Sequence, residues 1–131
     1  MNILKGKVCE VNYQDDLILV KINCENEIFK VLMLVPFKEL KLDQEIQMLF
    51  KEHELCFTSL NSNLSVENSF KAKISKIKEG KLLYHVFFKF HDQKLSSLIT
   101  KEKALELKLC QNQEWLCFIK ANDIILRTNN A

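Results

Sequence analysis

Two lysines occupy equivalent places in two stretches of similar pattern, LFKEHELCF at 49–57 and FIKANDIIL at 118–126. Each lysine follows a short apolar run and precedes polar residues and a second apolar run, which predicts a junction between two strands. The ammonium groups of Lys51 and Lys120 could each supply a positive charge to a bound anion. Because most strand-end lysines simply face water, the offset of 69 (120 minus 51) is first of all evidence for a repeat.

Other residues that could do chemistry are scattered along the chain. A zinc site built from His53, His85 and His91 is a weaker interpretation than isolated surface or strand histidines. The five cysteines form no CxxC pair and stand among apolar residues, which predicts buried, reduced thiols and a cytosolic protein: Cys9, Cys24, Cys56, Cys110 and Cys117. No nucleophile–base pair, phosphate loop or paired carboxylates stand out, so we expect neither an enzyme nor a metal site.

The elements that must position the lysines also repeat, with an offset of 66 at the start of each copy. NILKGKV at 2–8 aligns with NSFKAKI at 68–74, and both copies alternate apolar and polar residues before skipping to an odd spacing. The skip predicts a β-bulge at the same place in each first strand. A second alternating strand ends at Cys24 in one copy and at Phe90 in the other, and each precedes a tight turn.

The third strands are predicted over 29–35 and 95–100, and there the copies diverge. In the second copy KEKALELKL favours a short helix that Thr100 could cap. In the first copy that segment is four residues shorter, and Pro36 could begin a single turn. Asn112 precedes the fourth strand, at a place where a left-handed backbone is expected. Fourth and fifth strands then surround Lys51 and Lys120.

The predicted fold class is all-β with short helices, built as tandem OB-like five-stranded barrels. The chain of 131 residues divides into a degraded first repeat at 1–60, a linker at 61–67 and a second repeat at 68–131. Units this small bury only about 60% of their unfolded surface, so we expect them to pack on each other or on another chain. Phe88, Phe90 and Trp115 are predicted to lie in the core or at an interface.

The second repeat resembles the Mop/TOBE domain of molybdate- and tungstate-binding proteins. The resemblance rests on LSVENSFKAKI at the start, LSSLIT after the second strand and LELKLCQNQEWLCFIKANDIIL at the end. The first repeat keeps NILKGKV and the late lysine. The resemblance implies a tandem OB-like barrel, a homo-oligomer, and oxyanions bound between units. The chain has no GxxxxGK[ST] motif and no room for a DNA-binding helix-turn-helix domain, so it is most similar to the free tandem form.

Molybdate and tungstate are tetrahedral dianions, which favour hydroxyl and backbone N–H donors and a positive charge, without a carboxylate nearby. The resemblance carries this role to a set of residues in the second repeat: Ser65, Thr100, Lys103, Lys120, Ala121 and Asn122. Weaker candidates in the first repeat are Lys51 and His53. Val35 and Pro36 replace the Ile-Thr pair there, so we expect that repeat to act mainly as a scaffold.

Glu67 departs most from the family pattern, because it stands where arginine is frequent. A carboxylate about 4 Å from a bound anion would cost about 4 kcal/mol per charge pair at an effective dielectric near 20. Glu67 must therefore point away, pair with a lysine, or abolish binding.

The predicted function is non-catalytic, cytoplasmic binding of molybdate or tungstate for storage or homeostasis, linked to molybdate uptake. Implied partners are the oxyanion, further copies of the chain, and proteins of molybdate transport or cofactor synthesis; the residues do not discriminate a pterin ligand. One alternative is an OB-type nucleic-acid-binding module with His85 and Phe87 on its outer face. A net charge of +2 and a single arginine, Arg127, argue against it. Another alternative is a structural or regulatory relative that has lost its ligand.

Overall fold

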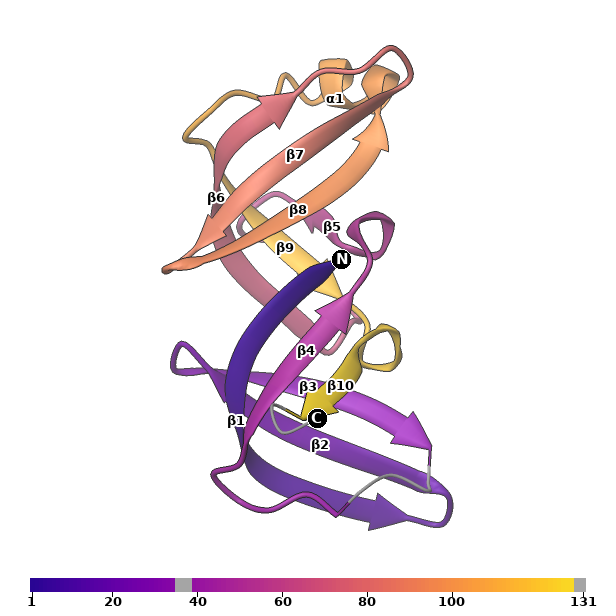
Figure 1. Cartoon of the computed structure of the whole chain (residues 1–131). Coiled ribbons are helices and arrows are strands. Elements are labelled where there is room, and N and C mark those ends of the chain that lie inside the picture. Colours follow the sequence, from indigo (N-terminus) through magenta and orange to yellow (C-terminus); the bar gives the residue numbers. More distant parts are fainter. Residues whose placement is uncertain (35–38, 129–131) are drawn as a thin grey trace.

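Two five-stranded antiparallel sheets make up the protein, and a computed structural model describes them over residues 1–34 and 39–128. The first sheet has the order β10–β4–β1–β2–β3, and the second has the order β5–β9–β6–β7–β8. In the first, β1 spans Asn2–Gln14, β2 Leu17–Cys24, β3 Glu27–Leu34, β4 Glu45–Phe50 and β10 Ile125–Thr128. In the second, β5 spans Cys56–Thr58, β6 Asn68–Lys78, β7 Leu83–Phe90, β8 Gln93–Thr100 and β9 Glu114–Ile119. Both sheets curl, as expected for OB-like barrels (Figure 1).

The predicted repeat is present strand by strand, and so is its bulge. The register of β1 against β2 shifts between Val8 and Glu10, and that of β6 against β7 shifts between Ile74 and Lys76. The two shifts are 66 residues apart, as the sequence indicated. A bulge at the same place bends both long first strands, which lets each one serve two neighbours in a curled sheet.

The turns and the helix follow local residue chemistry. Tight turns after β2 and β7 place Glu25, Asn26 and His91 at positive φ, and Asn112 before β9 has the expected left-handed backbone, at φ 73°. The helix α1 spans Lys101–Glu106, and the side chain of Thr100 caps it by accepting a hydrogen bond from the N–H of Lys103. The predicted turn at Pro36 lies outside the described residues.

The closing strands are exchanged between the repeats, which the sequence did not indicate. β5, from the first repeat, pairs with β9 of the second, and β10, from the second repeat, pairs with β4 of the first. Figure 1 shows yellow β10 beside magenta β4 in the lower half, below the sheet of the second repeat. The division into 1–60, 61–67 and 68–131 stays a proposal for the sequence repeats. Each folded sheet, in contrast, contains strands from both repeats.

One hydrophobic core runs through both halves. The rings of Phe29 in β3, Phe70 in β6 and Phe90 in β7 meet with centroids 4.8 to 6.0 Å apart. All three side chains are buried, as is Phe88, and Trp115 packs on the core through Phe57. The aromatic contact between β3 and the second sheet therefore joins the repeats by apolar burial, the main favourable term in folding.

Two buried asparagines join the repeats by hydrogen bonds that match under the 66-residue offset. The amide of Asn2 bonds to both backbone groups of Ser96 in β8, at 2.8 Å each. The amide of Asn68 does the same to Lys30 in β3, at 2.7 and 2.8 Å. Each first strand is thereby fastened to the third strand of the other repeat, and buried backbone groups are satisfied at the junction.

The cysteine prediction was right for two residues and wrong for three. Cys24 and Cys117 are buried, whereas Cys9, Cys56 and Cys110 are exposed, because their side chains lie on outward-facing or loop positions. Burial raises the pKa of Cys24 to about 11 and raises that of Cys117 well above its usual range. None of the helices in the described ranges is long and apolar enough to cross a membrane.

Candidate functional site

The two lysines that opened the sequence comparison introduce identical backbone turns. Lys51 precedes the 3-10 turn η1, Glu52–Glu54, and Lys120 precedes the 3-10 turn η2, Ala121–Asp123. Both lysines have extended backbone angles, and the carbonyl of each accepts a hydrogen bond from the third residue of its turn, at 3.0 and 3.1 Å. The first backbone N–H groups of η1 and η2 have no acceptor within their own turn, so an anion or a carboxylate can accept them.

In the second repeat, the backbone N–H that was predicted to bind the anion already donates a hydrogen bond to a carboxylate. The N–H of Ala121 donates to Oε1 of Glu67 at 2.7 Å. Glu67 therefore does not point away, and it pairs with no lysine among the described residues; these were the two arrangements expected to spare the site. An oxyanion that binds at Ala121 must displace this carboxylate or approach from another side, because the N–H has a single hydrogen to give. Ser65 stands two residues before Glu67, on the same segment.

The corresponding junction in the first repeat has the opposite polarity. Under the two offsets Glu67 corresponds to Met1 and Ala121 to Glu52. There the N-terminal ammonium of Met1 pairs with the carboxylate of Glu52, and the N–H of Lys51 donates to Glu54 at 2.7 Å. Groups of both turns are thus already bound by other groups of the protein, in η2 by the Glu67 carboxylate and in η1 by the Met1 ammonium. His53 is exposed on η1, beside two carboxylates that are already bound.

Thr100 and Lys103 form a second group of candidate donors, at the start of α1. Oγ1 of Thr100 accepts from the N–H of Lys103 at 3.2 Å, so the threonine caps the helix while its hydroxyl hydrogen stays available. The ammonium of Lys103 pairs with Glu106. The positive charge expected of Lys103 is therefore shared with a carboxylate, although this exposed pair is worth at most about 1 kcal/mol.

The fold separates these two groups of predicted site residues within one chain. η2 packs against β3, whereas α1 packs against β7 and β8. Figure 1 shows α1 at one end of the molecule and the yellow turn before β10 much nearer the middle. Conversely, η1 packs against β8, and Oγ of buried Ser97 in β8 donates to the carbonyl of Leu55 just after η1, at 2.6 Å. Each lysine turn therefore faces the third strand of the other repeat.

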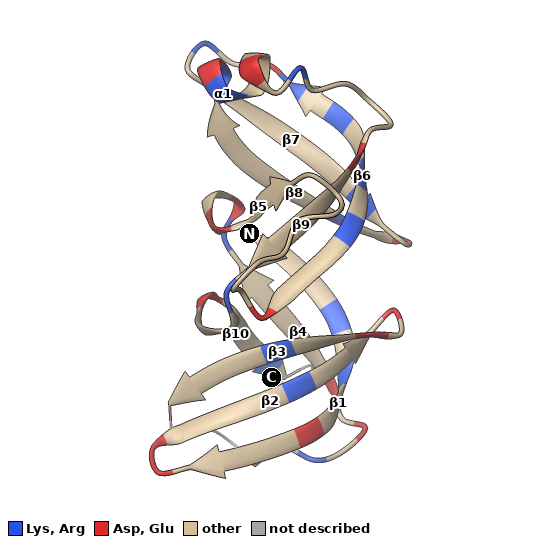
Figure 2. Cartoon of the chain, turned by 180° about the vertical axis from the view of Figure 1, so that it is seen from behind, with Lys and Arg blue, Asp and Glu red and all other residues tan. Residues whose placement is uncertain are grey.

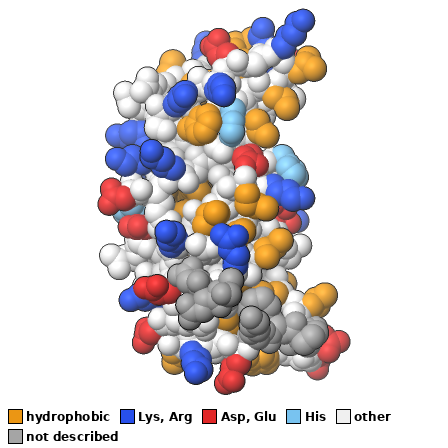
Figure 3. Space-filling view, viewed as in Figure 1, with side chains coloured by type: hydrophobic (Ala, Val, Ile, Leu, Met, Phe, Trp, Pro, Cys, Tyr) orange, Lys and Arg blue, Asp and Glu red, His pale blue; other side chains and the backbone are white. Residues whose placement is uncertain are grey.

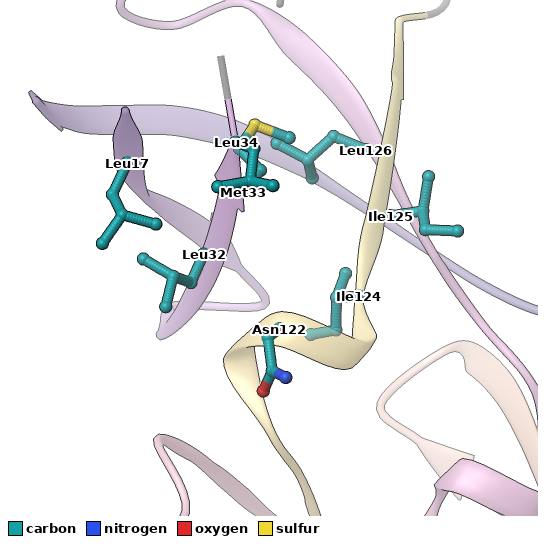
Figure 4. A pocket seen from close by; sticks show the side chains of 8 residues that line it. All are labelled: Leu17, Leu32, Met33, Leu34, Asn122, Ile124, Ile125 and Leu126. Carbon is teal, nitrogen blue, oxygen red and sulfur yellow. The ribbon is translucent and has the colours of Figure 1, made fainter. Parts of the chain in front are cut away.

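A pocket beside η2 is mostly apolar and does not suit a dianion. It has a volume of about 480 Å³, and its lining residues are Leu17, Leu32, Met33, Leu34, Asn122, Ile124, Ile125 and Leu126. The side chain of Asn122 lies at its edge and points away from the leucines (Figure 4). A tetrahedral dianion needs several donors, which this lining lacks, so Asn122 would serve an oxyanion only from outside the pocket.

The sequence comparison missed the bond between Glu67 and Ala121 and the two asparagine bridges. Asn2 and Asn68 were aligned as repeat partners. A polar residue at the start of a strand does not by itself predict a hydrogen bond to a strand of the other repeat. The outer face of β6 and β7, where the sequence already indicated His85 and Phe87, had a second signal in the lysine alternation of NSFKAKISKIK.

Comparisons with known proteins agree with the fold. Residues 64–126 match the family model described as the TOBE domain. The structure is similar to a crystal structure of the cytoplasmic molybdate-binding protein ModG with molybdate bound, at a TM-score of 0.87 and 20% sequence identity. That likeness covers 97% of this chain and 95% of the other. No curated protein matches the sequence.

Proposed function

We propose that the chain is a non-catalytic binding protein for a tetrahedral oxyanion, molybdate or tungstate, on the basis that residues 64–126 match the TOBE-domain model. The observation that carries the proposal is the likeness of nearly the whole chain to a molybdate-binding protein crystallised with its ligand. The repeated lysine turns supply the chemistry, because each places a lysine directly before the backbone N–H groups that begin a 3-10 turn.

The proposed ligand site draws on both donor groups of the second repeat. Lys120, Ala121 and Asn122, with Ser65, provide one group, and Thr100 with Lys103 provides the other. Because the groups lie apart in one chain, we propose that a homo-oligomer brings them together at an interface between copies. Lys51 and His53 serve a weaker site at the first repeat, where Glu52 and Glu54 oppose an anion.

The proposed cellular role is storage or homeostasis of the oxyanion in the cytoplasm, linked to its uptake. The exposed thiols of Cys9, Cys56 and Cys110 support a reducing compartment. Partners of this role are the oxyanion, further copies of the chain, and proteins of molybdate transport or cofactor synthesis.

Titration calorimetry on the assembled protein tests the proposal. We expect molybdate and tungstate to release heat and to bind more tightly than sulfate. Lys120→Ala should weaken binding at least about tenfold, because a charge-assisted contact is worth roughly 1.5 to 3 kcal/mol. Lys41→Ala removes an exposed lysine elsewhere and should leave binding unchanged. No heat with any of the three anions at millimolar concentration would refute the proposal.

The bond between Glu67 and Ala121 favours one alternative, a structural relative that no longer binds the ligand. This alternative predicts a stable oligomer with no anion heat in the natural chain and none in Glu67→Gln. Sedimentation velocity and calorimetry on both proteins separate the two functions, because the oxyanion proposal requires heat in the natural chain as well as in the variant.

A further inference from the structure

The outer face of β6, β7 and β8 in the second sheet carries one sign of charge. The sequences of β6, β7 and β8 contain six lysines and no aspartate or glutamate; the lysines are Lys71, Lys73, Lys76, Lys78, Lys89 and Lys94. The matching strands β1, β2 and β3 contain four lysines with two glutamates among them. Figure 2 shows the row of blue along β6 and the mixed colours along β1. Although the net charge of the chain is small, this face is positively charged and attracts polyanions.

An aromatic pair lies within this basic face. His85 and Phe87 lie on the outer side of β7, both half-buried, with ring centroids 4.2 Å apart and planes 36° apart, and Nε2 of His85 is buried without a hydrogen-bond partner among the described residues. The ammonium of Lys76, opposite Phe87 in the register, lies 5.8 Å from the centroid of the phenyl ring. Figure 3 shows lysine side chains around a patch of hydrophobic and histidine side chains over β7. Flat rings beside cations form a platform on which a base can stack.

In the first repeat, the three positions equivalent to Lys76, His85 and Phe87 hold different kinds of residue. Under the offset of 66, Phe87 corresponds to Lys21, Lys76 to Glu10 and His85 to Leu19. Lys21 and Glu10 form an ion pair at 3.1 Å. The internal repeat therefore provides a matched face with the same backbone, a neutral pair and no aromatic platform.

A hollow with polar and cationic walls adjoins the platform along the same strands. It has a volume of about 290 Å³ and is lined by Lys73, Ile74, Ser75, Lys89, His91 and Asn112. Lys73 and Lys89 stand directly opposite each other in the register, an arrangement that costs stability unless an anion lies between them. Carboxylates lie at its margins: Glu114 is opposite Lys73 on β9, and Glu27 is 3.8 Å from His91. The hollow suits a phosphate group.

We propose that the outer face of β6 and β7 binds single-stranded nucleic acid. A base stacks on Phe87 and His85, while Lys73, Lys76 and Lys89 contact the phosphates on either side. Single strands fit better than a duplex because their bases are free to leave the stack. Lysines act as point charges without the arginine fork that reads base edges, so the binding is independent of sequence. This function is separate from oxyanion binding and needs no residue of that site.

Fluorescence anisotropy with labelled oligonucleotides of about 12 nucleotides, at about 50 mM salt and without oxyanion, tests the proposal. We expect binding of single-stranded DNA or RNA that weakens as salt increases, and weaker binding of a duplex of the same length. Phe87→Leu keeps an apolar side chain but removes the ring and should weaken binding roughly tenfold, whereas Phe87→Trp should retain it.

Two matched triple lysine variants distinguish the effect of losing the lysines of the proposed face from the effect of a lower net charge. Lys73→Gln, Lys76→Gln and Lys89→Gln together should abolish measurable binding. Lys5→Gln, Lys7→Gln and Lys41→Gln together remove the same charge from the first repeat and should change affinity less than about twofold. No binding at low salt, equal loss in both triple variants, equal affinity for the duplex, or an unaffected Phe87→Leu would each overturn the proposal.

Discussion

At the scale of single residues, Glu67 has the most direct influence on the proposed ligand. Its carboxylate accepts the N–H of Ala121, which is the interaction that an oxyanion would make. A carboxylate and a tetrahedral anion have similar acceptor oxygens, so Glu67 acts as an internal competitor for the donor. Its negative charge also repels the dianion, and both effects weaken binding in the same direction.

Glu67→Gln and Glu67→Ala distinguish these two effects. Glutamine removes the charge but can still accept the N–H, so we expect molybdate affinity to rise about thirtyfold, since each of the two charges of the dianion costs about 1 kcal/mol beside the carboxylate at 4 Å in water. Alanine also frees the donor and should raise affinity further. Calorimetric titration of the three proteins measures both steps. Glu79→Gln, an exposed position, is the control for net charge, and equal or lower affinity in both Glu67 variants would show that no anion competes there.

Glu10 provides a residue-scale test of the ion pair that replaces the aromatic platform in the first repeat. A hydrogen bond from Asn12, followed by the hydrogen bond and charge of Lys21, lowers the pKa of its carboxyl group. A lowered carboxyl pKa stabilises the fold above the unfolded-state pKa of about 4.3, and the contribution is lost as pH falls through the lower folded value.

We therefore predict that the Glu10 carboxyl titrates below the usual glutamate range in a pH series of carbon NMR spectra. Asn12→Ala and Lys21→Gln should each move its pKa back toward the usual value, because the Asn12 amide and the Lys21 ammonium both lower it. A carboxyl that titrates normally in the unaltered protein would contradict the geometry of the pair.

At the scale of elements, local residue patterns predicted the strands but not their partners. The alternation in 18–24 and 84–90 and the skip after Val8 and Ile74 correctly indicated β2, β7 and both bulges. The hydroxyl of Thr100 correctly indicated the start of α1. The exchange of β5 and β10 could not be predicted, because alternation identifies a strand and its buried face without identifying the neighbouring strand.

The candidate site shows the same limit of local information. The offset of 69 located both lysine turns, since backbone turns follow from nearby residues. The separation of Thr100 from Lys120 depends on which sheet each closing strand joins, which is a non-local property. The role of Glu67 depends on a side chain that meets a turn 54 residues away, and no sequence spacing encodes such a contact.

The asparagine bridges connect elements across the repeats and carry a stability prediction. Asn68→Ala leaves both backbone groups of Lys30 without their partner, so we expect it to lower the free energy of unfolding by about 2 to 4 kcal/mol. Asn2→Ala should cost a similar amount through Ser96. Urea denaturation measures both losses, with exposed Asn63→Ala as the control. A loss below about 0.5 kcal/mol would show that water replaces the amide.

At the scale of the whole molecule, exchanged strands and a continuous core make the two repeats depend on each other. Neither repeat contains all five strands of a sheet, and Phe29 of the first packs on Phe70 and Phe90 of the second. Breaking one sheet exposes the closing strand that the other repeat supplies. We therefore expect one cooperative unfolding transition instead of two.

Leu126 tests this coupling because it belongs to the second repeat in sequence and to the first sheet in space. It is buried in β10 opposite Met48, so Leu126→Ala should cost about 2 to 5 kcal/mol. Trp115 lies in the second sheet, and its fluorescence should follow the same lowered urea midpoint as far-UV circular dichroism. Ile125→Ala, on the exposed side of β10, should shift neither signal appreciably. If the circular dichroism midpoint falls while that of Trp115 stays, the sheets unfold independently, and the strand exchange does not couple them.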